Sequence, residues 1–257
     1  ARYGIRGASC GFVSACASSS HALGSAYDEI ALGRQDRMIV VGAEECAAES
    51  ILPFDAMRAL STHADPDMAC RPFDQARDGF VVSGGAVALV LERASLAKRA
   101  PLARLLGWGQ AADGYHVASP HPEGIGIVTA MKRALQFAKV DEAAIDYVNA
   151  HATSTPAGDR AEALALRSVF GSASPAVVST KGLTGHGLSL SGVLEAALTV
   201  LSLMGGFLPG NRNLKSPDEA CEGLCLPTES MDADVKLAFN NSSGFGGANV
   251  CHVLAQP

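Results

Sequence analysis

Short apolar runs alternate with segments of helical spacing along this 257-residue chain. Continuous or alternating apolar runs predict strands, whereas apolar residues three or four positions apart predict helices with one buried face. By these criteria we expect strands near residues 8–14, 38–41, 87–91, 103–108, 147–150, 176–179, 237–239 and 250–254. We expect helices near residues 23–31, 127–138, 159–169 and 193–201. This alternation is typical of an α/β protein whose sheet is mainly parallel, with the strands at 38–41 and 87–91 buried.

The order of these elements indicates two related units. Residues 103–257 contain a full series of strands and helices, whereas residues 1–102 contain the last part of a similar series. A polar segment with proline and glycine, Pro53 to Gly85, interrupts the first unit and is too long for a plain connection. Since the first unit lacks its opening strands, we expect the chain to need an upstream segment or a separate chain to cover strand edges and apolar faces.

Composition narrows the class of protein. Hydrophobic residues make up 48% of the chain and charged residues 18%, which suits a compact α/β protein with a large core. A net charge of −6 without a long basic run argues against nucleic acid as a ligand. No continuous run of eighteen apolar residues and no signal peptide is present, so neither a membrane span nor secretion is expected.

The seven cysteines favour a reducing cytoplasm over a disulfide scaffold, because their number is odd and the chain is long. Cys221 and Cys225 are four residues apart with no second pair at zinc-ligand spacing, so no metal site is expected.

Cys16 differs from the other cysteines in its position. It stands where an extended run ends and a helical run begins, and the unpaired N–H groups of a helix N-terminus lower a cysteine pKa. Cys16 is therefore a candidate nucleophile, although a buried core thiol is the common alternative.

Three polar loops follow predicted strands and carry the other candidate residues. "HATSTPAGD" contains His151, "STKGLTGHG" contains Lys181 and His186, and "NNSSGFGGAN" is a glycine-rich turn. Ligands of open α/β sheets bind beyond the carboxyl ends of the strands, so these loops and Cys16 are expected to converge on one site. Lys181 has Glu195 available on the following helix as a partner in a buried ion pair. The remaining histidines are interpreted as structural or surface residues, namely His21, His63, His116, His121 and His252.

At these places the sequence resembles the β-ketoacyl-acyl carrier protein synthases, the elongating condensing enzymes of fatty acid and polyketide synthesis. The resemblance runs through "SACASSSHALG", "FDAMRALST", "ARDGFVVSGG", "HATSTPAGD", "STKGLTGHG" and "SGFGGANV" in the family's order. It implies a thiolase-like fold with α-β-α-β-α layers and two related halves, of which the first, residues 1–102, is incomplete here and the second is residues 103–257.

The resemblance also implies roles for single residues. The nucleophile would be Cys16, the active-site histidines His151 and His186, and the lysine Lys181 with Glu195 as its acidic partner. Thr153 and Thr155 would hold the phosphopantetheine arm, and the backbone N–H groups of Cys16 and Phe245 would form the oxyanion hole.

The implied reaction begins with transfer of an acyl group to the Cys16 thiolate. Loss of CO2 from malonyl-acyl carrier protein then gives an enolate, whose oxygen neutral His151 and His186 stabilise with N–H groups. The enolate carbon attacks the acyl group, and no metal or redox cofactor takes part. The implied partners are acyl carrier protein and a second ketosynthase-type subunit, in a homodimer or a heterodimer.

Departures from the family pattern leave the substrate class open. Ala152 replaces a common glycine, and residues 189–191 read Ser-Leu-Ser where Gly-Ala-Ala is usual. Ser243 stands where the family commonly has a phenylalanine beside the Phe245 position, so it is a candidate gate position that opens space for bulkier or stiffer acyl chains.

Three other functions remain as alternatives. A biosynthetic thiolase would carry a second cysteine in the glycine-rich turn, which has none, and cysteine hydrolases lack the pattern of His151, Lys181 and His186. A non-catalytic partner subunit that sets chain length is the third alternative; such partners usually lack the nucleophile, so Cys16 counts against it.

Overall fold

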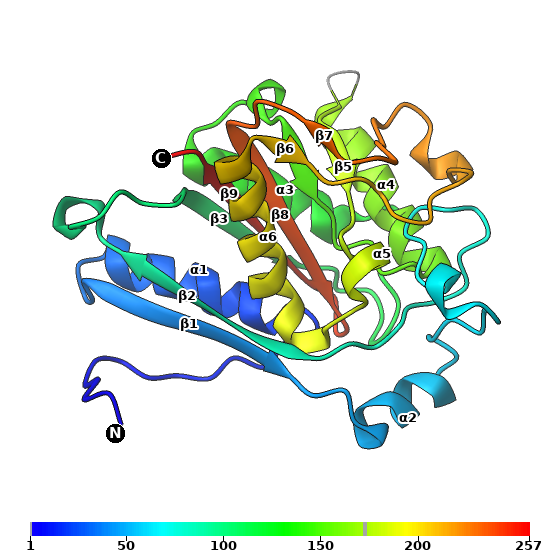
Figure 1. The fold of residues 1–257 in the computed structure, drawn as a ribbon, viewed down its shortest axis with the longest axis horizontal. Helices are drawn as coiled ribbons and strands as arrows, with labels where there is room; N and C mark the ends of the chain where they lie inside the picture. The colour runs from blue at the N-terminus through cyan, green and yellow to red at the C-terminus, as the bar shows by residue number, and fades with distance from the viewer. Residues whose placement is uncertain (1, 172–173) are drawn as a thin grey trace.

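A five-stranded sheet lies at the centre of the computed structural model, which describes residues 2–171 and 174–257 (Figure 1). In spatial order its strands are β3 (Arg104–Ala112), β9 (Ala248–Ala255), β8 (Leu237–Gly244), β4 (Tyr147–Asn149) and β5 (Ala176–Val178). Strand β4 pairs in parallel with β5 and β8, whereas β8, β9 and β3 pair antiparallel. The expectation of a mainly parallel sheet is therefore wrong. Gly246 and Gly247, with φ of +86° and +79°, form a tight turn that makes β8 and β9 a hairpin.

Helices cover both faces of this sheet. On one face, α3 (Ile125–Ala138) and α4 (Pro156–Phe170) pack on residues such as Val148, Phe239 and Val253. On the other face lie α1 (Ser18–Ala31) and α6 (Ser191–Gly205). These pairs of helices make the α/β layers expected from the sequence.

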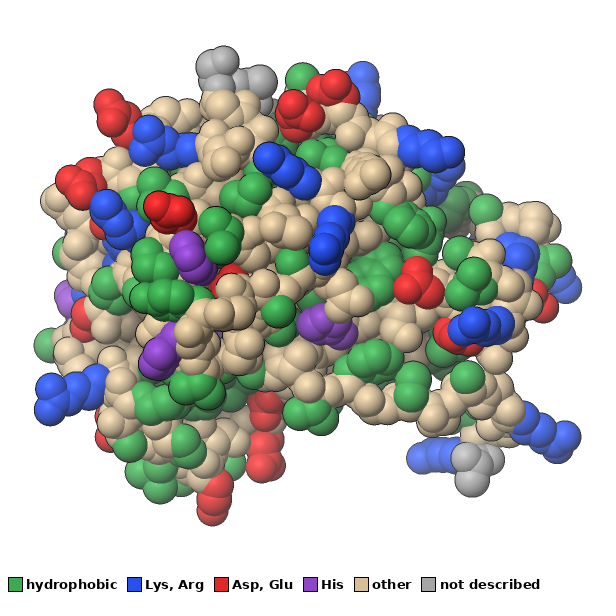
Figure 2. Space-filling model, turned by 180° about the vertical axis from the view of Figure 1, so that it is seen from behind, with side chains coloured by type: hydrophobic (Ala, Val, Ile, Leu, Met, Phe, Trp, Pro, Cys, Tyr) green, Lys and Arg blue, Asp and Glu red, His purple; other side chains and the backbone are tan. Residues whose placement is uncertain are grey.

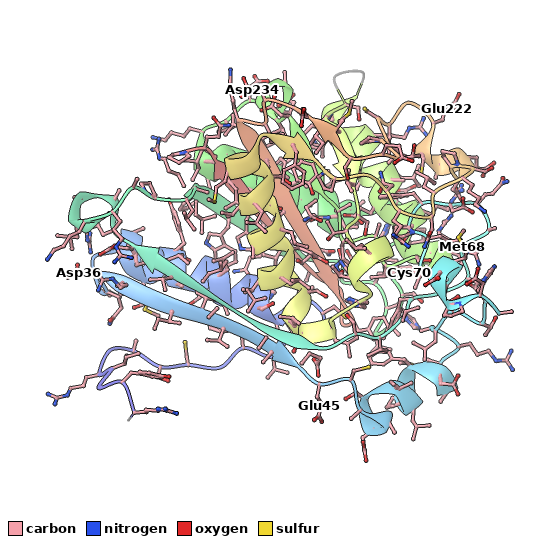
Figure 3. The ribbon with its side chains drawn as sticks, in the orientation of Figure 1. Asp36, Glu45, Met68, Cys70, Glu222 and Asp234 are labelled. Carbon is pink, nitrogen blue, oxygen red and sulfur yellow. The ribbon has the colours of Figure 1, made fainter. Side chains whose placement is uncertain are left out.

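A two-stranded antiparallel sheet forms the next layer beyond α1 and α6. Its strands are β1 (Arg37–Glu44) and β2 (Gly85–Glu92), and Asp36 and Glu45 lie at opposite ends of β1 in Figure 3. Val40 is buried against the helices, but Ile39, Val41 and Val90 are 49%, 59% and 63% exposed. The expectation of two buried strands is thus wrong within this chain, because alternate side chains point away from α1 and α6.

Several elements were not expected, and one expected strand is not formed. Residues 8–13 are extended and largely exposed, without strand pairing. Two helices that the apolar pattern did not predict are α2 (Ala48–Ala56) and the short α5 (Lys181–Thr184). The remaining elements are the strands β6 (Phe207–Leu208) and β7 (Met231–Asp232) and the 3₁₀ turns η1 (Pro66–Met68), η2 (Ala94–Leu96), η3 (Glu142–Ala144), η4 (Leu188–Leu190) and η5 (Glu219–Cys221).

One segment, Leu188–Gly205, meets the length and composition of a membrane span, with mean hydropathy 1.6. More than half of it is buried inside the fold, where α6 packs between the two sheets, and a core helix passes the same test. On the surface, Figure 2 shows basic and acidic side chains interspersed over one face of the molecule.

Candidate active site

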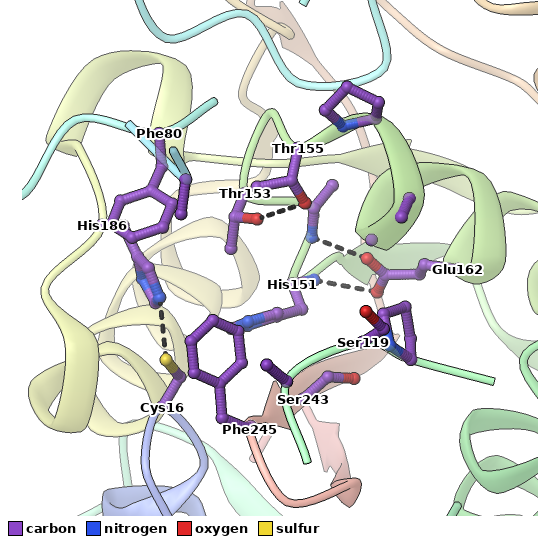
Figure 4. Close-up of a pocket in the computed structure, with 18 of the residues that line it drawn as sticks. Cys16, Phe80, Ser119, His151, Thr153, Thr155, Glu162, His186, Ser243 and Phe245 are labelled. Atoms are coloured by element: carbon purple, nitrogen blue, oxygen red, sulfur yellow. Dashed lines mark hydrogen bonds between the residues drawn. The ribbon is translucent and has the colours of Figure 1, made fainter. Parts of the chain in front are cut away.

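The three polar loops and the start of α1 meet at the carboxyl ends of β4, β5 and β8, as the sequence predicts. They surround a cavity of about 390 Å³ (Figure 4). Its lining includes seven of the candidate residues, namely Cys16, His151, Thr153, Thr155, His186, Ser243 and Phe245. Lys181 and Glu195 lie behind this lining, fully buried.

Cys16 lies two residues before the first residue of α1, and its Sγ is 3.1 Å from Nε2 of His186. The preceding Ala15 has φ of +49°, an uncommon conformation that turns the chain sharply into the helix. Burial raises the pKa of the Cys16 thiol to about 12, although the charge of Lys181 acts to lower it. The expectation of a lowered pKa is therefore wrong, because the loss of hydration on burial outweighs the charge of Lys181.

His186, in the "STKGLTGHG" loop, is the residue whose ring contacts the Cys16 thiol. Its Nδ1 lies 2.9 Å from Oγ of Ser191, and the ring of Phe80 meets it edge-on at 5.1 Å between centroids. Burial, and next the charge of Lys181, hold the pKa of His186 well below its usual range. The imidazole is therefore neutral at neutral pH, with one N–H and one acceptor nitrogen.

His151 stands beside His186, with ring centroids 5.3 Å apart in an edge-to-face arrangement. Its Nδ1 is 3.5 Å from Nζ of Lys181. Burial, Lys181 and His186 together keep its pKa far below the usual value, so this ring is also neutral. Two neutral imidazoles thus face one cavity beside one thiol (Figure 4).

Lys181 forms the buried ion pair with Glu195 that the sequence suggested. Burial raises the pKa of Glu195 to about 7, and the positive charge of Lys181 opposes that rise. The pair places a positive charge 3.5 Å from His151 without exposing it to the cavity. It therefore favours the uncharged form of both histidines.

Sequence reasoning missed Glu162 on α4, which is 2% exposed. Its two carboxylate oxygens accept hydrogen bonds from the backbone N–H groups of His151 and Ala152, at 2.9 and 2.6 Å, and from Nδ2 of Asn241 at 2.6 Å. Glu162 thus ties the "HATST" loop to β8. The signal was an acidic residue, Glu162, among alanines and leucines on the apolar face of a predicted helix, three positions after the equally buried Asp159.

The glycine-rich turn approaches Cys16 closely. A Cβ at Gly244 would lie 2.5 Å from the carbonyl oxygen of Ser14 and 3.3 Å from the backbone nitrogen of Cys16, so only glycine fits there. The next residue, Phe245, lines the cavity with its ring 6.1 Å from that of Phe54. The backbone of this turn therefore lies directly against the chain segment that carries Cys16.

The remaining candidates lie on two walls of the cavity. Oγ1 of Thr153 and Oγ1 of Thr155 are 3.1 Å apart. On another wall, Oγ of Ser243 donates to Oδ1 of Asn249 at 2.8 Å, and Nδ2 of Asn249 donates to Asp113 at 2.9 Å.

No group of three His, Cys, Asp or Glu side chains suited to a metal occurs within residues 2–171 and 174–257.

Two family descriptions together match most of the chain, up to residue 215. "Beta-ketoacyl synthase, N-terminal domain" matches residues 1–97, and "Beta-ketoacyl synthase, C-terminal domain" matches residues 102–215. The 3-oxoacyl-[acyl-carrier-protein] synthase 1 of Escherichia coli is 41% identical over 255 residues, which cover 97% of this chain and 62% of that protein. The chain thus spans about three fifths of the length of this relative.

Solved structures agree with the sequence matches. A type II polyketide synthase ketosynthase, determined with its acyl carrier protein and bound to the hexaketide, has a TM-score of 0.96 at 29% identity, over 100% of this chain and 65% of that one. A ketosynthase in complex with its chain length factor from Xenorhabdus doucetiae has a TM-score of 0.90 at 34% identity, over 100% and 62%.

Proposed function

Because this chain belongs to the β-ketoacyl synthase family, we propose that its protein condenses an acyl group held on Cys16 with malonyl-acyl carrier protein. The product is a β-ketoacyl-acyl carrier protein, so the protein is an acyltransferase of fatty acid or polyketide synthesis. One observation carries the proposal: a buried thiol and two neutral imidazoles face the same cavity.

In the first half-reaction, Cys16 attacks the thioester carbonyl of acyl-acyl carrier protein. A bond forms between Sγ and the carbonyl carbon, the carrier's sulfur leaves, and the thiol proton ends on that sulfur. The backbone N–H groups of Cys16 and Phe245 stabilise the oxyanion of the tetrahedral intermediate. Since burial raises the pKa of the free thiol, substrate binding and the N–H of His186 are needed to stabilise the thiolate.

In the second half-reaction, malonyl-acyl carrier protein enters and loses CO2. The electron pair of the broken C–C bond forms an enolate, whose oxygen accepts hydrogen bonds from N–H groups of His151 and His186. The enolate carbon then attacks the acyl carbonyl, and the bond to Sγ of Cys16 breaks. Lys181, paired with Glu195, adds its charge to the effect of burial, and together they keep both histidines neutral.

The partners follow from the same proposal. Acyl carrier protein delivers both substrates on phosphopantetheine, which Thr153 and Thr155 contact, and no separate cofactor is required. We expect a cytoplasmic enzyme that works as a homodimer or as the ketosynthase of a heterodimer, with residues 1–102 and 103–257 as its two related halves. Ser243 leaves room for bulkier acyl chains in the cavity beside Phe245.

Intact-protein mass spectrometry tests this function. The protein is incubated with acyl carrier protein that carries acyl chains of several lengths, and the mass of the protein is measured. We expect one acyl group on the wild type and on Cys10→Ala, whose cysteine is exposed, but none on Cys16→Ala, which also loses condensation while it remains folded. An acylated Cys16→Ala would overturn the role of Cys16, and an unmodified wild type would favour the non-catalytic partner subunit.

A further inference from the structure

Ser191 is a buried hydroxyl at the catalytic histidine that no step of the proposed reaction uses. It is the first residue of α6 and is 1% exposed. Its Oγ lies 2.9 Å from Nδ1 of His186, and in the described part of the chain this is its one hydrogen-bond partner. The opposite nitrogen of the ring, Nε2, faces Sγ of Cys16 at 3.1 Å. The imidazole therefore has one polar partner at each end.

The start of α6 holds Ser191 in a fixed position. The N–H of Val193 donates to Oγ of Ser19, and the carbonyl of Gly192 accepts from Nδ2 of Asn240. A Cβ at Gly192 would lie 2.0 Å from Oγ of Ser20, so α6 and α1 are in direct contact here. Because the helix start is anchored on α1 and on β8, the Ser191 hydroxyl is placed before any substrate binds.

Counting hydrogens decides between the two tautomers of the neutral ring. With the proton on Nε2, the Ser191 hydroxyl donates to Nδ1 and the ring donates to Cys16, so only the weak S–H donor lacks an acceptor. With the proton on Nδ1, the ring donates to Ser191 and the thiol donates to Nε2, so the strong O–H donor lacks an acceptor. An unpaired hydroxyl costs more free energy than an unpaired thiol, so the first arrangement is favoured.

We infer that Ser191 is a positioning residue, whose hydroxyl donates to Nδ1 of His186 and keeps the single proton of the ring on Nε2. That N–H is directed at Sγ of Cys16 and at the cavity beside it, where the enolate oxygen of the proposed reaction develops. The catalytic meaning of the inference rests on the proposed function, but the tautomer itself does not. Ser191 acts through His186 and does not touch the substrate.

The first test reads the tautomer directly. The intact protein is labelled with 15N in histidine, and the resonances of His186, assigned with His186→Asn, show which ring nitrogen carries the proton. We expect the proton on Nε2 in the wild type and a mixture of tautomers in Ser191→Ala, which lacks only the hydroxyl oxygen. Ser191→Cys, with a weaker donor and nearly the same volume, should lie between them.

The second test measures CO2 release from malonyl-acyl carrier protein. Ser191→Ala removes one hydrogen bond to the imidazole of His186, so the rate of CO2 release should fall about tenfold. Ser191→Cys should give an intermediate rate. Ser189→Ala is the matched control, since its hydroxyl lies two residues away and bonds to Glu44 instead of His186, and it should keep the wild-type rate. Thermal unfolding of each variant reports whether it is folded.

The outcomes separate the two proposals. A wild type that releases no CO2 would count against the proposed function, while the tautomer spectrum would still test Ser191. The inference is wrong if Ser191→Ala retains the proton on Nε2 and releases CO2 within about twofold of Ser189→Ala. If Ser191→Ala does not fold, Ser191→Cys decides by the same two readouts.

Discussion

The two sides of the cavity are built in opposite ways. On the nucleophile side, Cys16 packs among apolar groups such as Phe80, Val82 and Leu188, and within residues 2–171 and 174–257 its thiol has one hydrogen-bond partner, His186. On the polar side, His151, Glu162, Lys181 and Glu195 are equally buried, but ion pairs and hydrogen bonds connect them to one another and to the backbone.

This difference predicts which residues can be replaced one at a time without loss of stability. Removal of the Cys16 thiol leaves a small apolar gap, so the effect is confined to chemistry. Removal of a member of the polar side leaves a buried charge or donor without its partner, and such a loss lowers stability. If Cys16 is the nucleophile, as proposed, its side of the cavity serves reactivity alone, whereas the polar side also supports the fold.

The largest expected effect is on stability, from Glu195→Ala. This change leaves the Lys181 ammonium buried without its carboxylate, so we expect the free energy of unfolding to fall by about 3–5 kcal/mol. Urea denaturation measures it. The control is Glu219→Ala, which removes an exposed ion pair with Arg160 and should change stability by less than about 0.5 kcal/mol. Similar values for the two variants would show that the buried pair of Lys181 and Glu195 does not support the fold.

Next in size is the loss of catalysis in His151→Ala and in His186→Ala. Each removes an N–H donor for the enolate oxygen, which should cost about 3 kcal/mol, or a factor of about 10², in the rate of CO2 release. The rate is measured with malonyl-acyl carrier protein as the substrate. His63→Ala, at an exposed position, is expected to retain the wild-type rate. Retained CO2 release in both variants would remove this role from the two histidines.

A smaller effect concerns His252, a third buried histidine that lies outside the cavity, with Nε2 3.0 Å from the carbonyl oxygen of Ser20. Burial lowers its pKa to about 3. Because the unfolded chain binds a proton near pH 6.5 and the folded chain does not, stability is lost as the pH falls below that value.

Replacement of this histidine isolates the effect, because Gln does not titrate and retains an N–H donor for Ser20. Between pH 7 and pH 5 the wild type should lose about 2 kcal/mol more stability than His252→Gln. Urea denaturation of both proteins at the two pH values provides the measurement. Equal losses would show that burial alone does not suppress protonation of histidine in this fold.

The smallest expected effect is on substrate range. Ser243→Phe fills space beside Phe245, so bulky or stiff acyl chains should lose about 1 kcal/mol of transition-state binding relative to short linear ones. Ratios of kcat/KM for a set of acyl chains test this, and Ser119→Ala, elsewhere in the lining, serves as the control. An unchanged profile would show that position 243 does not gate the cavity.

Much of the fold was predictable because apolar runs mark buried strands regardless of their partners. Strands β3, β4, β5, β8 and β9 form near the residues expected. The direction of pairing was not predictable from those runs, since it depends on the turn at Gly246 and Gly247. The exposed face of β1 and β2 was misjudged for a related reason: an apolar pattern shows that a face can be buried, but not what covers it.

The grouping of the site residues was predictable from their place after strands, and the ion pair of Lys181 with Glu195 from the charge on the next helix. The pKa of Cys16 was not, because the apolar side chains that bury it, such as Phe80 and Leu188, come from distant segments. The contact between Ser191 and His186 depends on ring orientation, which no local pattern encodes. The roles of the site residues and the division at residue 102 remain predictions.

The separation in sequence between Cys16 and its partners has a consequence for biosynthesis. Cys16 and His186 are 170 positions apart, and the hydrogen bond that joins Ser20 to Ser242 spans 222 positions. At ordinary rates of translation, Cys16 is added to the nascent chain roughly 10–30 s before His186. During that interval the nascent chain carries an ordinary cysteine, open to oxidants and to disulfide exchange. The pocket around Cys16 is complete only when the β8–β9 hairpin lies against α1, so the thiol passes from the exposed nascent chain into the buried site in the same folding step.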